Sequence, residues 1–273
     1  MDLFYRELGK GQPIIILHGL YGNSDNWLSI GKSLAEKYKV YMIDQRNHGN
    51  SIHCKEHNFE LFKKDLAGFI QKKKIENPVL IGHSMGGKTA MYYTRDNMEK
   101  VKALIVVDIS PRDYTHSMFF EDRYNMHLNI ILSLESINLH TLLNRKEANS
   151  LLAKRIKSDS FRRFLLKNLK RDENKDFTWK LNLKSIKNNL REIFKGFNDE
   201  DGELRIETPA LFLKGELSDY IGEEDIAFIQ RVFINSEIIE VENTGHLIHA
   251  EKTDEFLRYV EDFLDRVEWK FYV

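Results

Sequence analysis

The sequence predicts an α/β fold: a mostly parallel sheet flanked by helices, with a helical insertion. Three observations support this prediction. Short apolar runs alternate with helical patterns, the apolar residues within each run are consecutive, and one long segment lacks such runs. Consecutive apolar positions are typical of strands covered on both faces, and alternating strands and helices are typical of a parallel sheet. With 273 residues, the chain can bury a full core without metals or disulfides.

The individual elements follow in chain order. Residues 3–8 alternate in polarity and end at a Gly-Lys-Gly turn, which favours an antiparallel first strand. The expected core strands are 14–17, 40–43, 79–81, 103–107, 210–213 and 238–241. The expected helices are 24–38, 59–74, 85–97 and 254–267.

Residues 112–205 break this rhythm, because they contain no proline, only two glycines and no clear strand. Leu, Ile and Phe recur there at helical spacing, so we expect a helical lid or cap inserted into a core formed by residues 1–111 and 206–273. The insertion has 19 Lys and Arg against 14 Asp and Glu, a net charge of +5. This charge is consistent with solvated helix faces or with a bias towards anionic substrates.

Composition restricts the classes of partner. The formal net charge is −1, which gives no global attraction to nucleic acid or to an anionic membrane. A single cysteine excludes an internal disulfide, and no apolar run is long enough to span a bilayer. The first residues lack the apolar region of a signal peptide. We therefore expect a soluble, cytoplasmic protein; the sequence does not indicate its oligomeric state.

Two motifs overlap in residues 79–89, VLIGHSMGGKT. Residues 82–86 match G-x-S-x-G, in which a serine, here Ser84, lies on a tight strand-to-helix turn. Residues 82–89 also match the phosphate-binding pattern G-x-x-x-x-G-K-[ST], with Lys88 as its lysine. The first motif predicts acyl transfer, and the second predicts nucleotide hydrolysis.

Other parts of the chain favour acyl transfer. A His-Gly-Leu loop follows an early strand, where the amide of Leu20 could stabilise an oxyanion together with the amide of Met85. His246 follows a glycine after the last strand, which gives the chain order serine, acid, histidine. A phosphate-binding loop usually opens the first strand–helix unit, whereas two such units come before Lys88.

On these residues the chain resembles the α/β-hydrolase family over essentially its full length. The segments DQRNHGNS, GHSMGGKTAM and VVDISP, with the Gly-His near the end, are similar to small intracellular carboxylesterases and acyl-CoA thioesterase-like enzymes. The resemblance implies hydrolysis of an ester or thioester with a short to medium acyl chain, without a metal or organic cofactor. It also implies that Lys88 belongs to the helix after the serine rather than to a phosphate site.

Ser84 is the expected nucleophile and His246 the expected general base, which later returns the proton. Two carboxylates could orient that histidine: Asp108, at the end of a strand, and Asp219, just beyond the usual place of the acid, which Ser218 occupies. We favour Asp108, because the resembled esterases use the earlier aspartate, with the serine as an additional hydrogen-bonding group.

Two further interpretations remain to be compared with the structure. His48, His53, Cys54 and His57 lie close together in the sequence, but their spacing matches no zinc pattern, so we predict no metal site. A homologue that binds a ligand without catalysis could also keep this fold and its serine.

Overall fold

The computed structural model describes residues 2–197, 199 and 201–270, and it confirms the predicted α/β class. A seven-stranded sheet has the order β1-β3-β2-β4-β5-β8-β9. Strand β1 pairs antiparallel with β3, as the alternating first segment predicts, and all other pairs in this sheet are parallel. The strands are β1 (Tyr5–Leu8), β2 (Pro13–Leu17), β3 (Lys39–Ile43), β4 (Val79–His83), β5 (Ala103–Val107), β8 (Ala210–Gly215) and β9 (Ser236–Val241).

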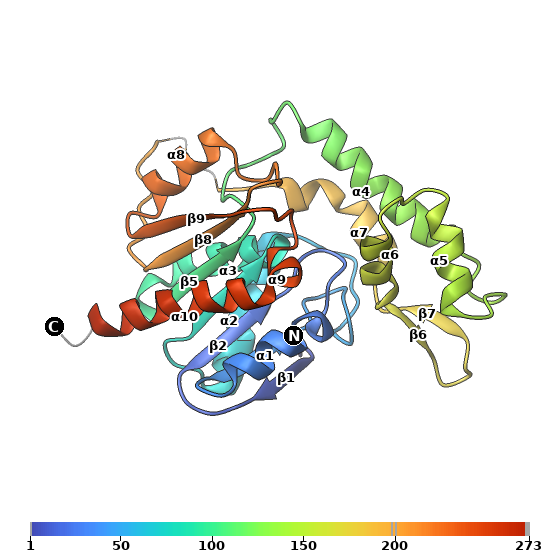
Figure 1. Cartoon of the computed structure of the whole chain (residues 1–273), viewed down its shortest axis with the longest axis horizontal. Coiled ribbons are helices and arrows are strands. Elements are labelled where there is room, and N and C mark those ends of the chain that lie inside the picture. The colour runs from blue at the N-terminus through green and yellow to red at the C-terminus, as the bar shows by residue number, and fades with distance from the viewer. Residues whose placement is uncertain (1, 198, 200, 271–273) are drawn as a thin grey trace.

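Helices cover both faces of this sheet (Figure 1). Helices α1 and α10 pack on one face, and α2, α3 and α8 pack on the other. Alternate side chains of a strand serve the two cores: Leu104 and Val106 of β5 join one cluster, and Ile105 joins the other. The helices are α1 (Leu28–Leu34), α2 (Phe59–Lys73), α3 (Met85–Asp96), α8 (Glu223–Val232), α9 (Ile248–Glu251) and α10 (Thr253–Lys270), with short 3-10 turns η1 (Ser24–Trp27) and η2 (Met98–Lys100).

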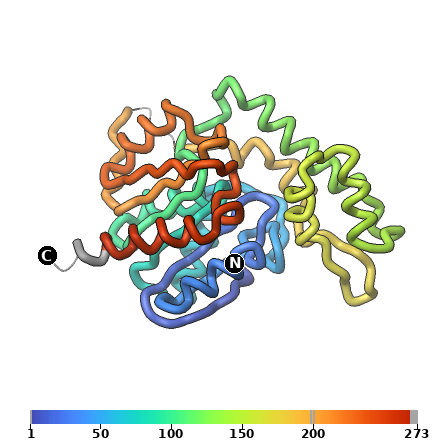
Figure 2. The backbone as a smooth tube through the Cα atoms, viewed as in Figure 1, coloured from blue at the N-terminus to red at the C-terminus, as the bar shows by residue number. Residues whose placement is uncertain are grey.

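Between β5 and β8 the chain leaves the sheet and forms a separate helical layer beside it (Figures 1 and 2). This layer also contains a two-stranded antiparallel hairpin, so the expectation of no strand in residues 112–205 is wrong. Each strand has only three residues, which is too short for a visible period-2 pattern. The elements of the layer are α4 (Phe120–Glu135), α5 (Arg145–Ala153), α6 (Asp159–Leu166), β6 (Leu169–Arg171), β7 (Phe177–Trp179), α7 (Leu183–Asn188) and the 3-10 helix η3 (Leu190–Phe194).

The two connections of this layer to the core lie against each other. The Tyr114 amide donates to the Phe194 carbonyl at 2.9 Å, and the Phe197 amide donates to the Pro111 carbonyl at 2.8 Å. A Cβ on Gly196 would lie 2.1 Å from the carbonyl carbon of Arg112, so this close approach needs a glycine. We call residues 111–114 and 194–197 the two necks, and the layer between them the cap.

Candidate active site

Ser84 lies on a sharp turn between β4 and α3, at the carboxyl edge of the sheet. Its backbone has φ 51° and ψ −117°, a strained conformation for a residue with a Cβ. Small neighbours allow the turn to close, because a Cβ on Gly86 would lie 2.2 Å from the Leu17 carbonyl oxygen, and one on Gly82 would lie 2.4 Å from the Gly86 oxygen. This geometry raises a half-buried hydroxyl above the strand ends, as G-x-S-x-G predicts.

The structure brings His246 and Asp108 together. The two groups share a hydrogen bond of 2.8 Å between His246 Nδ1 and Asp108 Oδ2. Asp108 follows β5 and is completely buried, and its other partners are the Gly215 amide, which donates to Oδ1 at 3.0 Å, and the Ser218 hydroxyl, which donates to Oδ2. Three donors hold the carboxylate in place, and the bond to Nδ1 orients the imidazole.

The loop that carries His246 also contacts the strand that carries Ser84. His83, the residue before Ser84, donates through Nε2 to the His246 carbonyl oxygen at 2.8 Å. Because a carbonyl can only accept, the proton of this bond belongs to the His83 ring. The two imidazole rings are 4.5 Å apart between centroids, and burial lowers the pKa of His83 well below its usual value. His83 therefore holds the histidine loop against the turn as a neutral ring.

Asp219 points elsewhere. Its side chain is 71% exposed and pairs with Arg123 of α4 at 3.2 Å. Its neighbour in the chain, Ser218, contacts Asp108 instead. Of the two carboxylates considered from the sequence, the structure places Asp108 against His246.

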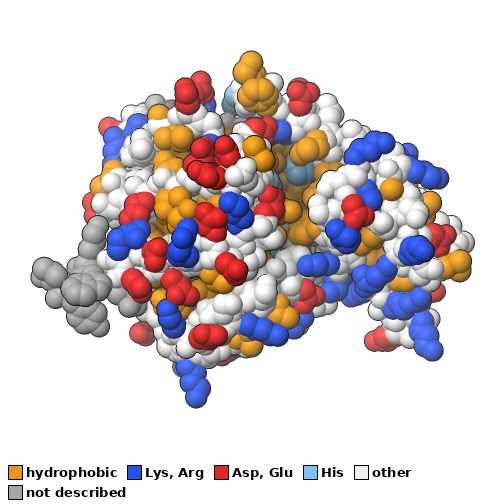
Figure 3. Space-filling model, viewed as in Figure 1, with side chains coloured by type: hydrophobic (Ala, Val, Ile, Leu, Met, Phe, Trp, Pro, Cys, Tyr) orange, Lys and Arg blue, Asp and Glu red, His pale blue; other side chains and the backbone are white. Residues whose placement is uncertain are grey.

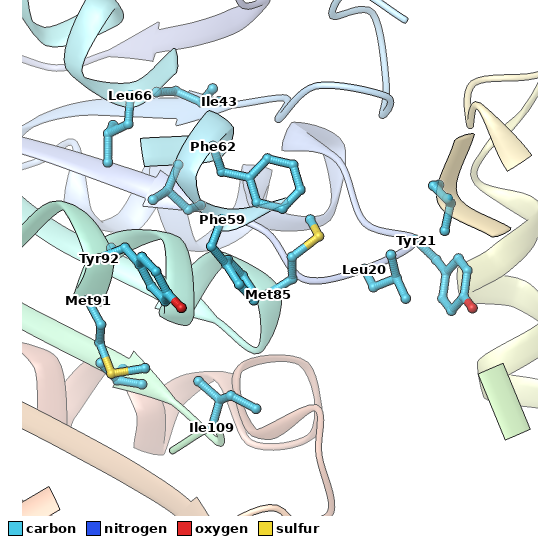
Figure 4. Close-up of a cluster of buried hydrophobic side chains, with 14 of the residues drawn as sticks. Leu20, Tyr21, Ile43, Phe59, Phe62, Leu66, Met85, Met91, Tyr92 and Ile109 are labelled. Carbon is cyan, nitrogen blue, oxygen red and sulfur yellow. The ribbon is translucent and has the colours of Figure 1, made fainter. Parts of the chain in front are cut away.

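The loop after β2 lies directly beside the turn. A Cβ on Gly19 would approach His83 Nδ1 to 2.5 Å, so only glycine allows this contact between loop and strand. Leu20 and Met85, the predicted oxyanion donors, are both members of one buried cluster, drawn in Figure 4. Within the described part of the chain, no group accepts a hydrogen bond from the amide of either residue. Both amides are thus free to donate to a ligand.

The structure argues against a phosphate-binding loop. The Lys88 side chain is 1% exposed, and its ammonium donates to the main-chain carbonyls of Arg112, Phe194 and Lys195 at 2.9, 3.3 and 2.5 Å. A phosphate-binding lysine needs its ammonium free to reach the ligand. Lys88 instead belongs to the α3 helix and faces the necks of the cap.

The histidine-rich loop has structural partners. Arg46 forms a buried ion pair with Asp65 at 2.6 and 2.8 Å, and the His48 ring bonds the Arg46 carbonyl at 2.9 Å. His57 packs edge-on against Phe62. Among the described residues, no group of three or more histidine, cysteine or acidic side chains could hold a metal ion.

Sequence reasoning missed a set of cap contacts above His246. The Tyr220 ring stacks on the His246 ring at 4.1 Å and 21°. His127 of α4 lies between two phenols, with Nδ1 3.2 Å from the Tyr21 hydroxyl and Nε2 3.3 Å from the Tyr220 hydroxyl. Burial lowers the pKa of His127 to about 4, so this ring is neutral near pH 7. His127 lies 106 positions from Tyr21 and 93 positions from Tyr220, and no local pattern connects these residues.

Comparisons with known proteins identify the family of the chain. The family model described as the alpha/beta hydrolase fold matches residues 12–253. A Danio rerio protein named sn-1-specific diacylglycerol lipase ABHD11 is 38% identical over 264 residues, covering 94% of this chain and 80% of that protein. Esterase YbfF of Escherichia coli is 27% identical over 259 residues, covering 94% of this chain and 94% of that protein.

A solved structure named marine microorganism esterase has a TM-score of 0.90 and 42% sequence identity, covering 96% of this chain and 99% of that one. None of the described helices is sufficiently long and apolar to cross a bilayer. With its parallel sheet, its serine turn and these relatives, the chain belongs to the α/β-hydrolase family and is a carboxylic ester hydrolase.

Proposed function

We propose that this protein hydrolyses esters through an acyl-enzyme on Ser84, with His246 as general acid and base and Asp108 as the orienting acid. The hydrogen bond of 2.8 Å between His246 Nδ1 and Asp108 is the observation that carries the proposal. It fixes the tautomer that has its proton on Nδ1 and leaves the Nε2 lone pair free. That lone pair is what a serine hydroxyl needs as a proton acceptor.

The proposed reaction has two halves. In the first, Ser84 Oγ bonds to the ester carbonyl carbon while His246 Nε2 takes its proton, and the resulting oxyanion accepts hydrogen bonds from the amides of Leu20 and Met85. The tetrahedral intermediate then expels the alcohol, which receives the proton from His246. In the second half, water loses a proton to His246 and attacks the acyl-enzyme carbonyl carbon. The bond to Ser84 Oγ then breaks, the carboxylic acid is released, and His246 returns the proton to Oγ.

The proposed substrates are small carboxylic esters or thioesters with a short to medium acyl chain, and acyl-CoA is one candidate. We propose that residues 112–205 act as a lid over this substrate. Figure 3 shows a hollow between core and cap in which apolar side chains are exposed, and it shows Lys and Arg side chains over the cap. An apolar floor suits an acyl chain, and basic groups near its rim suit an anionic leaving group. The cytoplasm is the proposed compartment, in keeping with a free Cys54.

Covalent labelling by a fluorophosphonate tests this mechanism, because the reagent reacts with an activated serine. We expect the wild-type protein to be labelled at Ser84 and the S84A variant to remain unlabelled. A panel of esters and thioesters of increasing chain length then defines the substrate class. If the wild type is folded but is not labelled, a non-catalytic binding protein is the better description.

A further inference from the structure

The lysine of the motif at residues 82–89 has no role in the mechanism above, yet its surroundings are unusual. Lys88 is 1% exposed, and no described carboxylate lies within 4.0 Å of its ammonium. A buried lysine is costly unless its charge is compensated. Burial lowers the pKa of Lys88 to about 7, although the more distant Asp113 and Asp225 oppose this shift. The fold therefore buries an ionisable amine one helical turn after Ser84.

The partners of Lys88 come from both necks of the cap. Its three N–H groups match three carbonyl oxygens, one on the outgoing neck at Arg112 and two on the returning neck at Phe194 and Lys195. The ammonium also lies 4.4 Å from the centre of the Tyr114 ring, a cation–π distance. A single side chain of α3 thus holds both connections of the cap.

These necks lead directly to the groups that cover His246. The Tyr114 hydroxyl donates to the Tyr220 carbonyl at 2.6 Å, and the Tyr220 ring stacks on His246. The Phe194 ring packs 5.8 Å from the His127 ring, which in turn contacts the Tyr220 hydroxyl. Two short series of contacts therefore join the ammonium of Lys88 to the wall of the candidate site.

We propose that Lys88 is a positioning residue, whose ammonium ties the two necks of the cap to the helix after Ser84 and so fixes Tyr220 and the cap residue His127 beside His246. The expected effect of Lys88 on ester hydrolysis rests on the proposed function. The structural effect of Lys88, a fixed position of the necks, is independent of the chemistry at Ser84.

The test compares K88M, which keeps the length and apolar stem but lacks the donors, with K88R, which keeps charge and donors. K64M is the matched control, because Lys64 is an exposed lysine on α2. For K88M we expect amide hydrogen exchange to accelerate at least tenfold at residues 112–115 and 194–197 and to stay unchanged in the sheet. K88R should restore part of the protection, and K64M should match the wild type.

Kinetics separate positioning from mere stability. For K88M we expect at least a tenfold lower kcat/KM for p-nitrophenyl octanoate, mainly through KM, and less than a threefold change for p-nitrophenyl acetate, whose acyl group is too short to reach the cap. Its melting temperature should change little, because removal of the cost of burying a charge offsets the loss of the donor to three carbonyls.

The proposal would be overturned if the necks of K88M exchanged their amide hydrogens at the wild-type rate. It would also be overturned if kcat/KM fell equally for both esters. Failure of both Lys88 variants to fold would overturn it too, since Lys88 would then be a requirement for folding. If the wild-type protein is not labelled by a fluorophosphonate, the proposed function fails, while the exchange experiment still decides whether Lys88 holds the necks.

Discussion

Replacing Asp108 by asparagine tests the candidate triad most directly, because the structure determines how the new amide must lie. The Gly215 amide donates to Oδ1 at 3.0 Å, so the asparagine oxygen has to keep that position. The amide nitrogen then takes the place of Oδ2 and faces His246 Nδ1. Since that nitrogen is a donor, Nδ1 must accept, and the imidazole proton moves to Nε2.

In this tautomer His246 cannot take the proton of Ser84. The expected loss in kcat is about four orders of magnitude, or about 5.5 kcal/mol in activation free energy. The volume of the side chain hardly changes, so the fold should be retained. The matched control is D219N: Asp219 is exposed, and its carbonyl oxygen continues to accept from Arg123 at 2.5 Å. Because the exposed Asp219 side chain pairs with Arg123 rather than with His246, kcat should stay within about threefold of the wild-type value.

The assay measures kcat with p-nitrophenyl acetate at pH 8, with melting temperatures to establish that each variant is folded. A folded D108N enzyme within tenfold of the wild type would refute the assignment of Asp108. A thousandfold loss in D219N would show that the exposed carboxylate reaches His246 during turnover.

Three further changes probe the surroundings. The S218A variant loses one donor to the triad acid, and we expect kcat to fall about tenfold. A hydrogen bond to a charged group contributes about 1.5–3 kcal/mol, and water can replace part of it. An unchanged kcat would show that this hydroxyl is dispensable. The G19A variant places a Cβ 2.5 Å from His83 Nδ1. Chemical denaturation should therefore show a loss of about 1–3 kcal/mol in the free energy of unfolding. Wild-type stability would mean that the loop after β2 can move freely. Burial lowers the pKa of His57 and His249 to about 3, so between pH 6.5 and 3 the unfolded chain binds more protons than the folded one. Their contribution to stability is therefore complete above pH 6.5 and is lost as the pH falls, by up to about 1.4 kcal/mol per pH unit for each ring. Denaturation curves between pH 7.5 and 5 should show this slope, and a smaller one in H57L; identical slopes would refute the attribution to His57.

The core of the fold could be predicted from the sequence because its signals are local. The consecutive apolar residues of β4 and β5 identify strands buried on both faces. The serine turn and the placement of Asp108 at a strand end follow from the same pattern, because carboxyl ends of parallel strands meet at one edge of a sheet. The proximity of Asp108 to His246 therefore depends mainly on topology.

No comparable local pattern in the sequence indicates the contacts that the cap makes. His127 meets Tyr21 across 106 positions and Tyr220 across 93 positions, so no spacing along the chain relates them. The partners of Lys88 are main-chain carbonyls, which every residue possesses, and the sequence therefore cannot show them. The hairpin strands β6 and β7 are held by three residue pairs, and three residues each are too few to show the alternation of a strand.

The pairing of the two necks has a consequence for how such enzymes diversify. Since the Phe197 amide reaches the Pro111 carbonyl at 2.8 Å, the chain enters and leaves the cap at nearly the same point of the core. A segment with adjoining ends can lengthen, shorten or be exchanged without altering the separation of the strands that it interrupts. Substrate preference can thus evolve by replacement of a whole module, while the chemistry is inherited intact.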